Sequence, residues 1–459
     1  MRFYFGILQA LKKFHNMDTT QLIEAKPFFT EDTIVFGLLM LMLGFVFYTS
    51  TSENSFWKKF YKYVPALLMA YMLPAALTTF GIIAPEWGLE NEQGALVEVT
   101  GKSQAYYIAS RFMLPAALVL MTISIDLKAV FNLGWKALAM FGTGTLGVII
   151  GGPIAVFLIA LVSPETVGGA GADAVWRGLS TLAGSWIGGG ANQAAMLEIY
   201  EYNTTNYAGM VIVDIVVANI WMAILLLGIG KQKKIDKWLK ADNSSIETLK
   251  EKVSSYASSI SRNPTLADFM VILGIAFTVV GFSHFGANEI SEFLKSNVEA
   301  VSDKKSAWSS FGSQFFWMIS IATILGIILS FTRIKKYEGA GASKIGSVFI
   351  YILVATIGMK MDLTKIVDNP GLIVVGLIWM AIHVALLILV AKLIKAPYFF
   401  LAVGSKANIG GAASAPVVAA AFHPSLATVG VLLAVFGYVV GTYGAMLTAE
   451  LMRIIAPIT

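Results

Sequence analysis

The sequence predicts an all-α polytopic membrane protein with two inverted-topology repeats. Each repeat is expected to hold about five transmembrane helices and one re-entrant or broken Gly-rich segment. The 459-residue chain is 57% hydrophobic and only 13% charged, a composition typical of proteins that cross a bilayer many times. Long apolar runs follow one another and leave little room for a soluble domain. Two Gly-rich stretches, 184–193 and 404–414, resemble each other and lie inside such runs.

The apolar runs are each close to or above the ~20 residues that cross a bilayer as a helix. They are 33–50, 64–84, 106–125, 137–163, 178–198, 207–230, 265–284, 308–332, 345–360, 371–391, 397–421 and 425–449. The longest polar connection runs from Lys231 to Pro264 and is rich in Ser, Glu and Lys. We therefore expect an N-terminal interfacial segment, a first repeat, a cytosolic linker and a second repeat, at residues 1–30, 31–230, 231–264 and 265–459.

The distribution of basic residues indicates how the chain is threaded. Lys and Arg gather in loops around Lys58, Lys128, Lys231 and Lys335, and acidic or neutral connections alternate with them. Basic loops are generally cytoplasmic. These loops share one side only if both Gly-rich segments are re-entrant hairpins, whereas twelve full crossings would separate the Lys231 cluster from the Lys58 loop. The hairpin arrangement is favoured, although it leaves the basic N-terminus and Lys304 outside.

The two halves also match outside the Gly-rich segments. Asp126 and Asp362 each precede a Leu at the end of an apolar run, and each is followed by a glycine and another long run. Both carboxylates are also well suited to cap a helix, an interpretation that leaves the repeat intact. Five crossings per half is an odd number, so the second half is expected to be inverted, as in many secondary transporters.

The Gly-rich segments are the candidate substrate site. Irregular backbone at membrane depth survives only where it is buried in protein or lines a cavity. A helix that restarts after glycines presents free N–H groups and a positive dipole end, which attract anions. The alternative is close helix packing through small residues. The candidate residues are Ser185, Gly188, Gly189, Gly190, Asn192, Gln193, Ser405, Lys406, Asn408, Gly410, Gly411 and Ser414.

Three ionisable residues inside apolar runs are considered for a functional role. Lys406 could pair a substrate carboxylate or replace a coupling cation, or it could extend its ammonium to the cytoplasmic interface. Asp214 is the candidate coupling group, with Asn219 five residues on, and its alternative role is a structural partner of Arg111. For His383, a hydrogen-bonded packing role is favoured over proton transfer.

Other function classes find little support. The chain has no cysteine, so it has no disulfide and no Cys-based metal site. The pattern in 142–147 matches a dinucleotide-binding fingerprint, but it lies inside an apolar run and indicates close helix packing together with Gly151 and Gly152. No Walker loop or hydrolase motif is present. We therefore expect no enzyme activity, no cofactor other than Na⁺ at the hairpins, and no nucleic-acid partner.

The stretches 185–192 and 404–411 resemble the YjcL-like family of bacterial integral membrane proteins, a family defined as a domain of unknown function, family 819. The resemblance covers most of the chain. The overall plan also resembles elevator-type carriers such as the bile-acid/sodium and citrate or glutamate/sodium symporter groups, which is an architectural analogy. Association of the family with peptide metabolism implies an amino acid or small peptide as substrate.

The sequence thus predicts a secondary active transporter in the bacterial inner membrane. It would move a small organic, anionic solute coupled to Na⁺ or H⁺, with membrane lipid as its surroundings and a homodimer as an open option. A passive channel or facilitator and an intramembrane receptor or structural protein are the alternatives. A carrier needs a coupling group such as Asp214, whereas a channel shows charged rings or a constriction.

Overall fold

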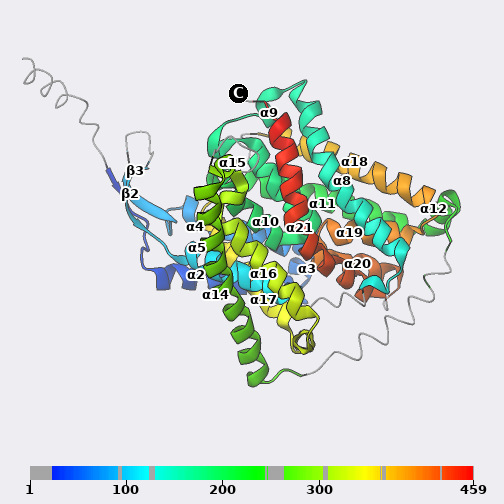
Figure 1. Cartoon of the computed structure of the whole chain (residues 1–459), viewed down its shortest axis with the longest axis horizontal. Coiled ribbons are helices and arrows are strands. Elements are labelled where there is room, and N and C mark those ends of the chain that lie inside the picture. Colours follow the sequence, from blue (N-terminus) through cyan, green and yellow to red (C-terminus); the bar gives the residue numbers. More distant parts are fainter. Residues whose placement is uncertain are drawn as a thin grey trace, which may run out of the picture.

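The computed structural model is nearly all helical (Figure 1) and describes residues 23–90, 96–123, 130–242, 246, 263–302, 309–361, 363, 369–423 and 426–457. Asp126, Asp362 and most of the expected linker and N-terminal segment lie outside the described residues.

The first half contains α2 (Asp32–Ser50), α3 (Ser55–Tyr63), α4 (Ala66–Thr79), the continuous run α5 (Ala105–Ile108), η1 (Ala109–Met113) and α6 (Leu114–Ile123), then α8 (Trp135–Ala160), α9 (Pro164–Val167), η2 (Gly171–Asp173), α10 (Val175–Tyr200), η3 (Thr204–Asn206), α11 (Tyr207–Ile229) and α12 (Gln232–Leu239). The second half contains α14 (Leu266–Asn297), α15 (Glu299–Ser302), η4 (Ser309–Gly312), α16 (Gln314–Ser330), η5 (Arg333–Ala340), α17 (Ala342–Met359), α18 (Gly371–Leu393), α19 (Tyr398–Asn408), α20 (Gly411–Phe422) and α21 (Ala427–Ile455).

Eight helical stretches of the described chain are long and apolar enough to cross a membrane: α2, α5 through α6, α8, the η3–α11 run, α14, α17, α18 and α21. The count reaches ten when α4 and α16 are taken with the helices bent away from them, α3 and η5. These ten segments correspond to ten of the predicted apolar runs, and the two remaining runs are the Gly-rich ones. The prediction of a polytopic helical membrane protein is confirmed.

Side chains define several helix starts. Thr265 accepts a hydrogen bond from the backbone N–H of Asp268, and the Asp268 carboxylate accepts one from the N–H of Thr265. This reciprocal capping box satisfies two N–H groups that the first turn of α14 leaves without helical partners. Asn54 and Ser313 cap α3 and α16 in the simpler way, with one bond each. These caps define where the three helices begin.

A small antiparallel sheet, which the sequence did not predict, lies beside the helices (Figure 1). Its order is β1 (Ile23–Ala25), β2 (Glu86–Glu90) and β3 (Leu96–Lys102). The expected interfacial segment, residues 1–30, therefore contains strand β1, and the acidic connection after α4 forms the antiparallel strands β2 and β3. Asp32 joins the sheet to α2 because its Oδ1 accepts hydrogen bonds from Ser103 Oγ and from the N–H of Gln104, both at 2.8 Å.

The helices pack as two groups. In the first bundle, α6 contacts α14, α16 and α17, while α17 also contacts α2 and α4. In the second, which we name the hairpin bundle, α8 contacts α18, α19 and α21, α10 packs along α21, and α11 contacts α18. Each bundle takes helices from both halves of the chain.

Loop contacts define two faces of the molecule. Lys136 at the start of α8 pairs with Asp242 after α12 at 3.1 Å, and the N–H of Asp242 donates to the carbonyl of Lys395 after α18. These ends, together with the Lys-rich α12, form a basic face, which the positive-inside rule assigns to the cytoplasm. At the opposite face, Asn369 before α18 donates to Thr166 O after α8 at 2.9 Å.

Glycines permit the close contact between α8 and α18. A Cβ added at Gly151 or Gly152 would lie 2.6 Å from ring atoms of Trp379, and Trp379 Nε1 donates to Val148 O at 2.8 Å. The packing interpretation of this glycine-rich run is therefore supported, and the dinucleotide pattern has no structural basis here.

The Gly152→Val substitution should lower the stability of the protein by about 1–3 kcal/mol, because the indole of Trp379 fills the space that a larger side chain needs. Gly142→Val in the same helix is the matched control, since nothing lies within 4 Å of a Cβ there. Thermal unfolding of both purified variants in detergent measures the difference. Equal melting temperatures would show that the α8–α18 contact is not tight.

Candidate functional site

The first Gly-rich segment folds back on itself. Helix α10 breaks at Gly189, whose φ of 73° and ψ of −171° are not helical. Its two ends lie together: the N–H of Asn203, just after the segment, donates to Ala172 O, just before it, at 2.9 Å. The rings of Trp176 and Tyr200 also meet, at 5.3 Å between centroids. The segment therefore enters and leaves at the same face, and we name it hairpin 1.

The second Gly-rich segment has the same form. Helix α19 ends at Asn408 and α20 begins at Gly411, with Gly410 between them at a φ of 105°. The outer ends of the two helices lie together, with the ring centroids of Phe399 and Phe422 5.3 Å apart. We name α19 and α20 hairpin 2. The geometry agrees with the prediction of hairpins rather than broken spanning helices.

The two hairpins open to opposite faces and meet at their tips. Helix α11 starts directly after hairpin 1 and ends beside the open end of hairpin 2, where Leu225 O accepts a hydrogen bond from Tyr398 Oη at 2.8 Å. A methyl group added at Gly411 would lie 3.8 Å from Gly189 Cα. Two breaks far apart in the sequence thus meet between the faces, and the left-handed backbone at each explains the glycines.

Asp214 holds the two arms of hairpin 1 together. Its carboxylate is buried in the middle of α11 and accepts hydrogen bonds from Ser185 Oγ at 2.7 Å, Trp186 Nε1 at 2.7 Å and Gln193 Nε2 at 3.1 Å. Arg111 is not its partner, since the guanidinium pairs with Glu198 at 3.1 Å. The pairing of Asp214 with Arg111, which the sequence offered as the alternative, is therefore wrong.

Asn219, which the sequence grouped with Asp214 as a candidate for ion coupling, does not share the face of Asp214. Its side chain is exposed and donates to Ile215 O of its own helix at 2.7 Å. Five residues correspond to about 500° of helix rotation, which turns the side chain roughly 140° away from Asp214.

The two predicted asparagines fix the hairpins to neighbouring helices. Asn192 Oδ1 accepts from Thr442 Oγ1 at 2.5 Å, and its Nδ2 donates to Gly188 O at 2.9 Å. Asn408 Oδ1 accepts from Thr145 Oγ1 at 2.8 Å, and its Nδ2 donates to carbonyls of α8 and α19. Their hydrogen-bonding groups are already used within the protein.

Ser405 is likewise engaged. Its hydroxyl lies 2.8 Å from His383 Nε2 and receives a hydrogen bond from Trp221 Nε1, also at 2.8 Å. The other ring nitrogen of His383 lies 3.0 Å from Gly144 O. Both nitrogens of this fully buried histidine have partners, which agrees with its predicted packing role.

Lys406, Gly410 and Ser414 remain as groups with unused capacity at the tip of hairpin 2. Lys406 is only 2% exposed, so its ammonium does not extend to the interface, and Nζ donates to Ala218 O at 3.2 Å. Ser414 Oγ is buried and has no hydrogen-bond partner among the described residues. Gly410 itself is exposed, while Gly189 and Gly190 are half-buried. The tips are therefore not fully enclosed by the described part of the chain.

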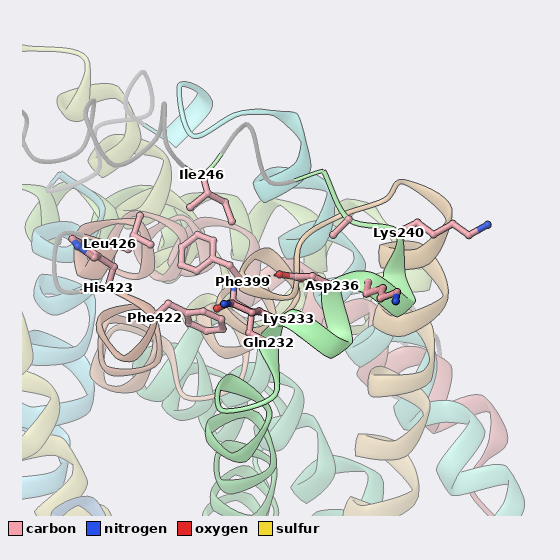
Figure 2. Close-up of a pocket in the computed structure, with 11 residues that line it drawn as sticks. Gln232, Lys233, Asp236, Lys240, Ile246, Phe399, Phe422, His423 and Leu426 are labelled. Atoms are coloured by element: carbon pink, nitrogen blue, oxygen red, sulfur yellow. Dashed lines mark hydrogen bonds between the residues drawn. The ribbon is translucent and has the colours of Figure 1, made fainter.

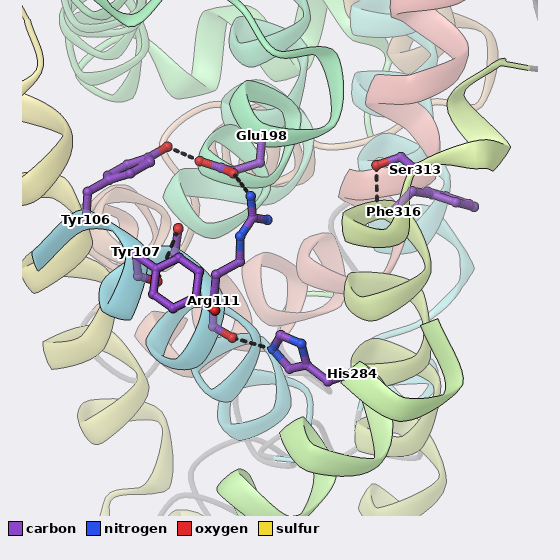
Figure 3. Close-up of polar contacts among 8 residues, drawn as sticks. Tyr106, Tyr107, Arg111, Glu198, His284, Ser313 and Phe316 are labelled. Atoms are coloured by element: carbon purple, nitrogen blue, oxygen red, sulfur yellow. Dashed lines mark hydrogen bonds and ion pairs between the residues drawn. The ribbon is translucent and has the colours of Figure 1, made fainter. Parts of the chain in front are cut away.

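A cluster that the sequence did not reveal lies near the open end of hairpin 1 (Figure 3). Glu198 receives hydrogen bonds from Arg111 and from Tyr106 Oη. Arg111 lies in the π-helical turn η1, and its carbonyl faces His284 Nε2 on α14 at 2.8 Å. The cluster borders a cavity of about 860 Å³ at the face opposite the basic one. The only sequence signal was one charge in each of two separate runs.

A second cavity, of about 560 Å³, lies at the open end of hairpin 2 on the basic face (Figure 2). Phe399, Phe422, Asp236 and Lys240 are among the residues that line it, and the Lys240 side chain extends away from the other three. Asp236 Oδ1 accepts a hydrogen bond from the N–H of Tyr398 at 2.8 Å, so α12 supports the start of hairpin 2.

Comparison with known proteins places these features in a family. Residues 37–455 match the family model described as "Protein of unknown function (DUF819)". The chain is also 25% identical over 358 residues to the "Uncharacterized membrane protein YjcL" of Bacillus subtilis (strain 168), covering 74% of this chain and 82% of that protein. Because the family model spans most of the sequence, including both hairpins, this protein is a multi-pass membrane protein of the DUF819 family.

Proposed function

We propose that this protein is a secondary carrier that moves a small organic solute across the bacterial plasma membrane by alternating access. The observation that carries the proposal is the meeting of two hairpin tips, entering from opposite faces, beside the buried Lys406. Polar groups and broken helices at membrane depth are typical of transporter binding sites. The solute class suggested by the family resemblance is an amino acid or a small peptide.

The order of elements supports an inverted repeat. Helix α8, hairpin 1 and α11 follow one another in the first half, as α18, hairpin 2 and α21 do in the second. Since the hairpins open to opposite faces, the two triplets have opposite orientations. We infer that the hairpin bundle moves against the first bundle, as in an elevator-type carrier.

The contact between Glu198 and Arg111 supports two separable bodies. Glu198 belongs to hairpin 1, whereas Arg111 and Tyr106 belong to the first bundle. The contact lies at the face opposite the basic one, which we call the outer face. We name this contact the outer latch. An ion pair that borders a water-accessible cavity can open and re-form, because water replaces the lost hydrogen bonds of both partners.

Coupling to a cation is part of the proposal. Asp214 is the buried carboxylate of the hairpin bundle, and its negative charge lies within electrostatic reach of Lys406. A Na⁺ or a proton that compensated this charge would link solute movement to an ion gradient.

Replacing Glu198 with Gln should open the outer face about tenfold more often, because the ion pair of the latch is lost. The chain has no cysteine, so a single Ser414→Cys reports on the tip without background labelling. A membrane-impermeant thiol reagent applied from the outer face should react about tenfold faster in the Glu198→Gln background. The matched control is Glu450→Gln, whose partners Arg453 and Tyr200 both belong to the hairpin bundle.

Cross-linking the latch tests alternating access directly. A Tyr106→Cys and Glu198→Cys pair joined by a short reagent should stop labelling of a tip cysteine from outside and leave labelling from the basic face intact. A control pair at Thr78 and Met359, whose contact lies within the first bundle, should change neither. Unaltered labelling after latch cross-linking would contradict the carrier and favour a passive channel.

A further inference from the structure

The tip of hairpin 2 places an incompletely bonded ammonium beside an unpartnered hydroxyl. An ammonium has three N–H donors, and Lys406 Nζ uses one of them on Ala218 O. Among the described residues Lys406 forms no ion pair within contact distance. A Cβ added at Gly410 would collide with Ser414 Oγ and lie 3.1 Å from Lys406 Nζ. Both polar atoms therefore border the same small space, which only glycine leaves open.

The backbone adds positive potential to that space. Helix α20 is 12 residues long and begins at Gly411, with Gly410 at its N-cap and no side-chain capping bond. Its first N–H groups have no helical acceptors, and the helix dipole makes this end positive. The exposure of Gly410 shows that the space is reached from outside the protein. Ammonium, hydroxyl and free N–H groups together form a donor set suited to a carboxylate.

The bonding of Asp214 determines what must accompany such an anion. Lys406 and Asp214 balance each other while the site is empty, so a carboxylate would add one uncompensated negative charge in a low-dielectric region. Of the three partners of Asp214, Trp186 Nε1 and Gln193 Nε2 can only donate, whereas the Ser185 hydroxyl can rotate and accept. A proton on Asp214 Oδ2 is therefore accommodated by turning Ser185, and three donors facing the carboxylate leave little room for Na⁺.

We propose that this site takes one carboxylate together with one proton. The carboxylate binds Lys406 Nζ, Ser414 Oγ and the first N–H groups of α20, and the proton comes from solvent and binds Asp214 Oδ2. The titratable groups around Asp214 are Lys406 on α19, Tyr71 on α4 and Tyr207 on α11. This inference rests on the proposed carrier function and specifies its substrate class and coupling ion.

Charge-selective modification tests the anion site without knowledge of the natural solute. In a Ser414→Cys variant, an anionic methanethiosulfonate should react about tenfold faster than a cationic one, relative to a free thiol, because the local potential attracts anions. Lys406→Met should abolish this preference, and Lys392→Met, at a lysine that packs on Trp238, should preserve it. Equal rates with both reagents, absence of reaction, or persistence of the preference in Lys406→Met would each overturn the site.

Thermal stabilisation by potassium acetate tests the proton, with acetamide as the uncharged control. Acetate stays ionised between about pH 6 and 8, and its apparent Kd should fall about tenfold for each unit by which the pH is lowered, as one proton binds with it. Asp214→Asn should remove this slope while acetate still binds. A pH-independent Kd, a requirement for Na⁺, or equal stabilisation by acetamide would contradict the proposal.

The carrier function and the carboxylate site can be contradicted separately. If latch cross-linking changes access to the tip but the anionic reagent has no advantage, the carrier stands and the carboxylate site falls. If the anionic reagent is preferred but cross-linking has no effect, the site stands and alternating access falls.

Discussion

Backbone groups inside a membrane need hydrogen-bond partners, and this constraint governs the architecture. Continuous helices satisfy it within each segment, whereas the broken tips of the two hairpins cannot. The protein satisfies the tips by bringing them together and enclosing them among the four other helices of the same bundle, α8, α11, α18 and α21. Gly189 lies opposite Gly411, and each has a positive φ that favours glycine. The inner position of the hairpins, the packing of α10 along α21 and the small residues of both stretches all follow from this requirement.

Charge is subject to the same constraint. Lys406 and Asp214 are both buried near the place where the hairpin tips meet. Lys406 lies on hairpin 2, and Asp214 lies on α11, which is hydrogen-bonded to hairpin 1. Asp214 accepts hydrogen bonds from three donors, but Lys406 has one acceptor, Ala218 O, for its three N–H groups. A buried charge with spare donors is unfavourable unless it serves a ligand. Because the cation has unused hydrogen-bond donors and the carboxylate has its partners, the site is expected to bind an anionic solute.

Local sequence signals predicted much of this fold, and tertiary relations account for what was missed. Apolar runs depend on composition alone, so the expected run at 371–391 nearly coincides with α18. The breaks followed from glycines at membrane depth. Asn192 and Asn408 hold helices together, whereas Lys406 and Ser414 keep unused hydrogen-bonding groups. The sequence could not distinguish these two pairs, because the difference depends on neighbours that are distant in the chain, such as Thr442 and Thr145. The Glu198–Arg111 pair and the small sheet join distant segments and carry no local signature.

The opposite orientation of the hairpins is the central claim, and sidedness labelling measures it most directly. Single cysteines would be placed at Thr205, beside the open end of hairpin 1, and at His423, beside that of hairpin 2, both exposed positions. In intact cells, an impermeant maleimide should label the first and spare the second, and inside-out vesicles should show the reverse. Labelling of both cysteines from the same side would mean that the hairpins do not enter from opposite faces, and the inverted arrangement with its shared central site would be contradicted.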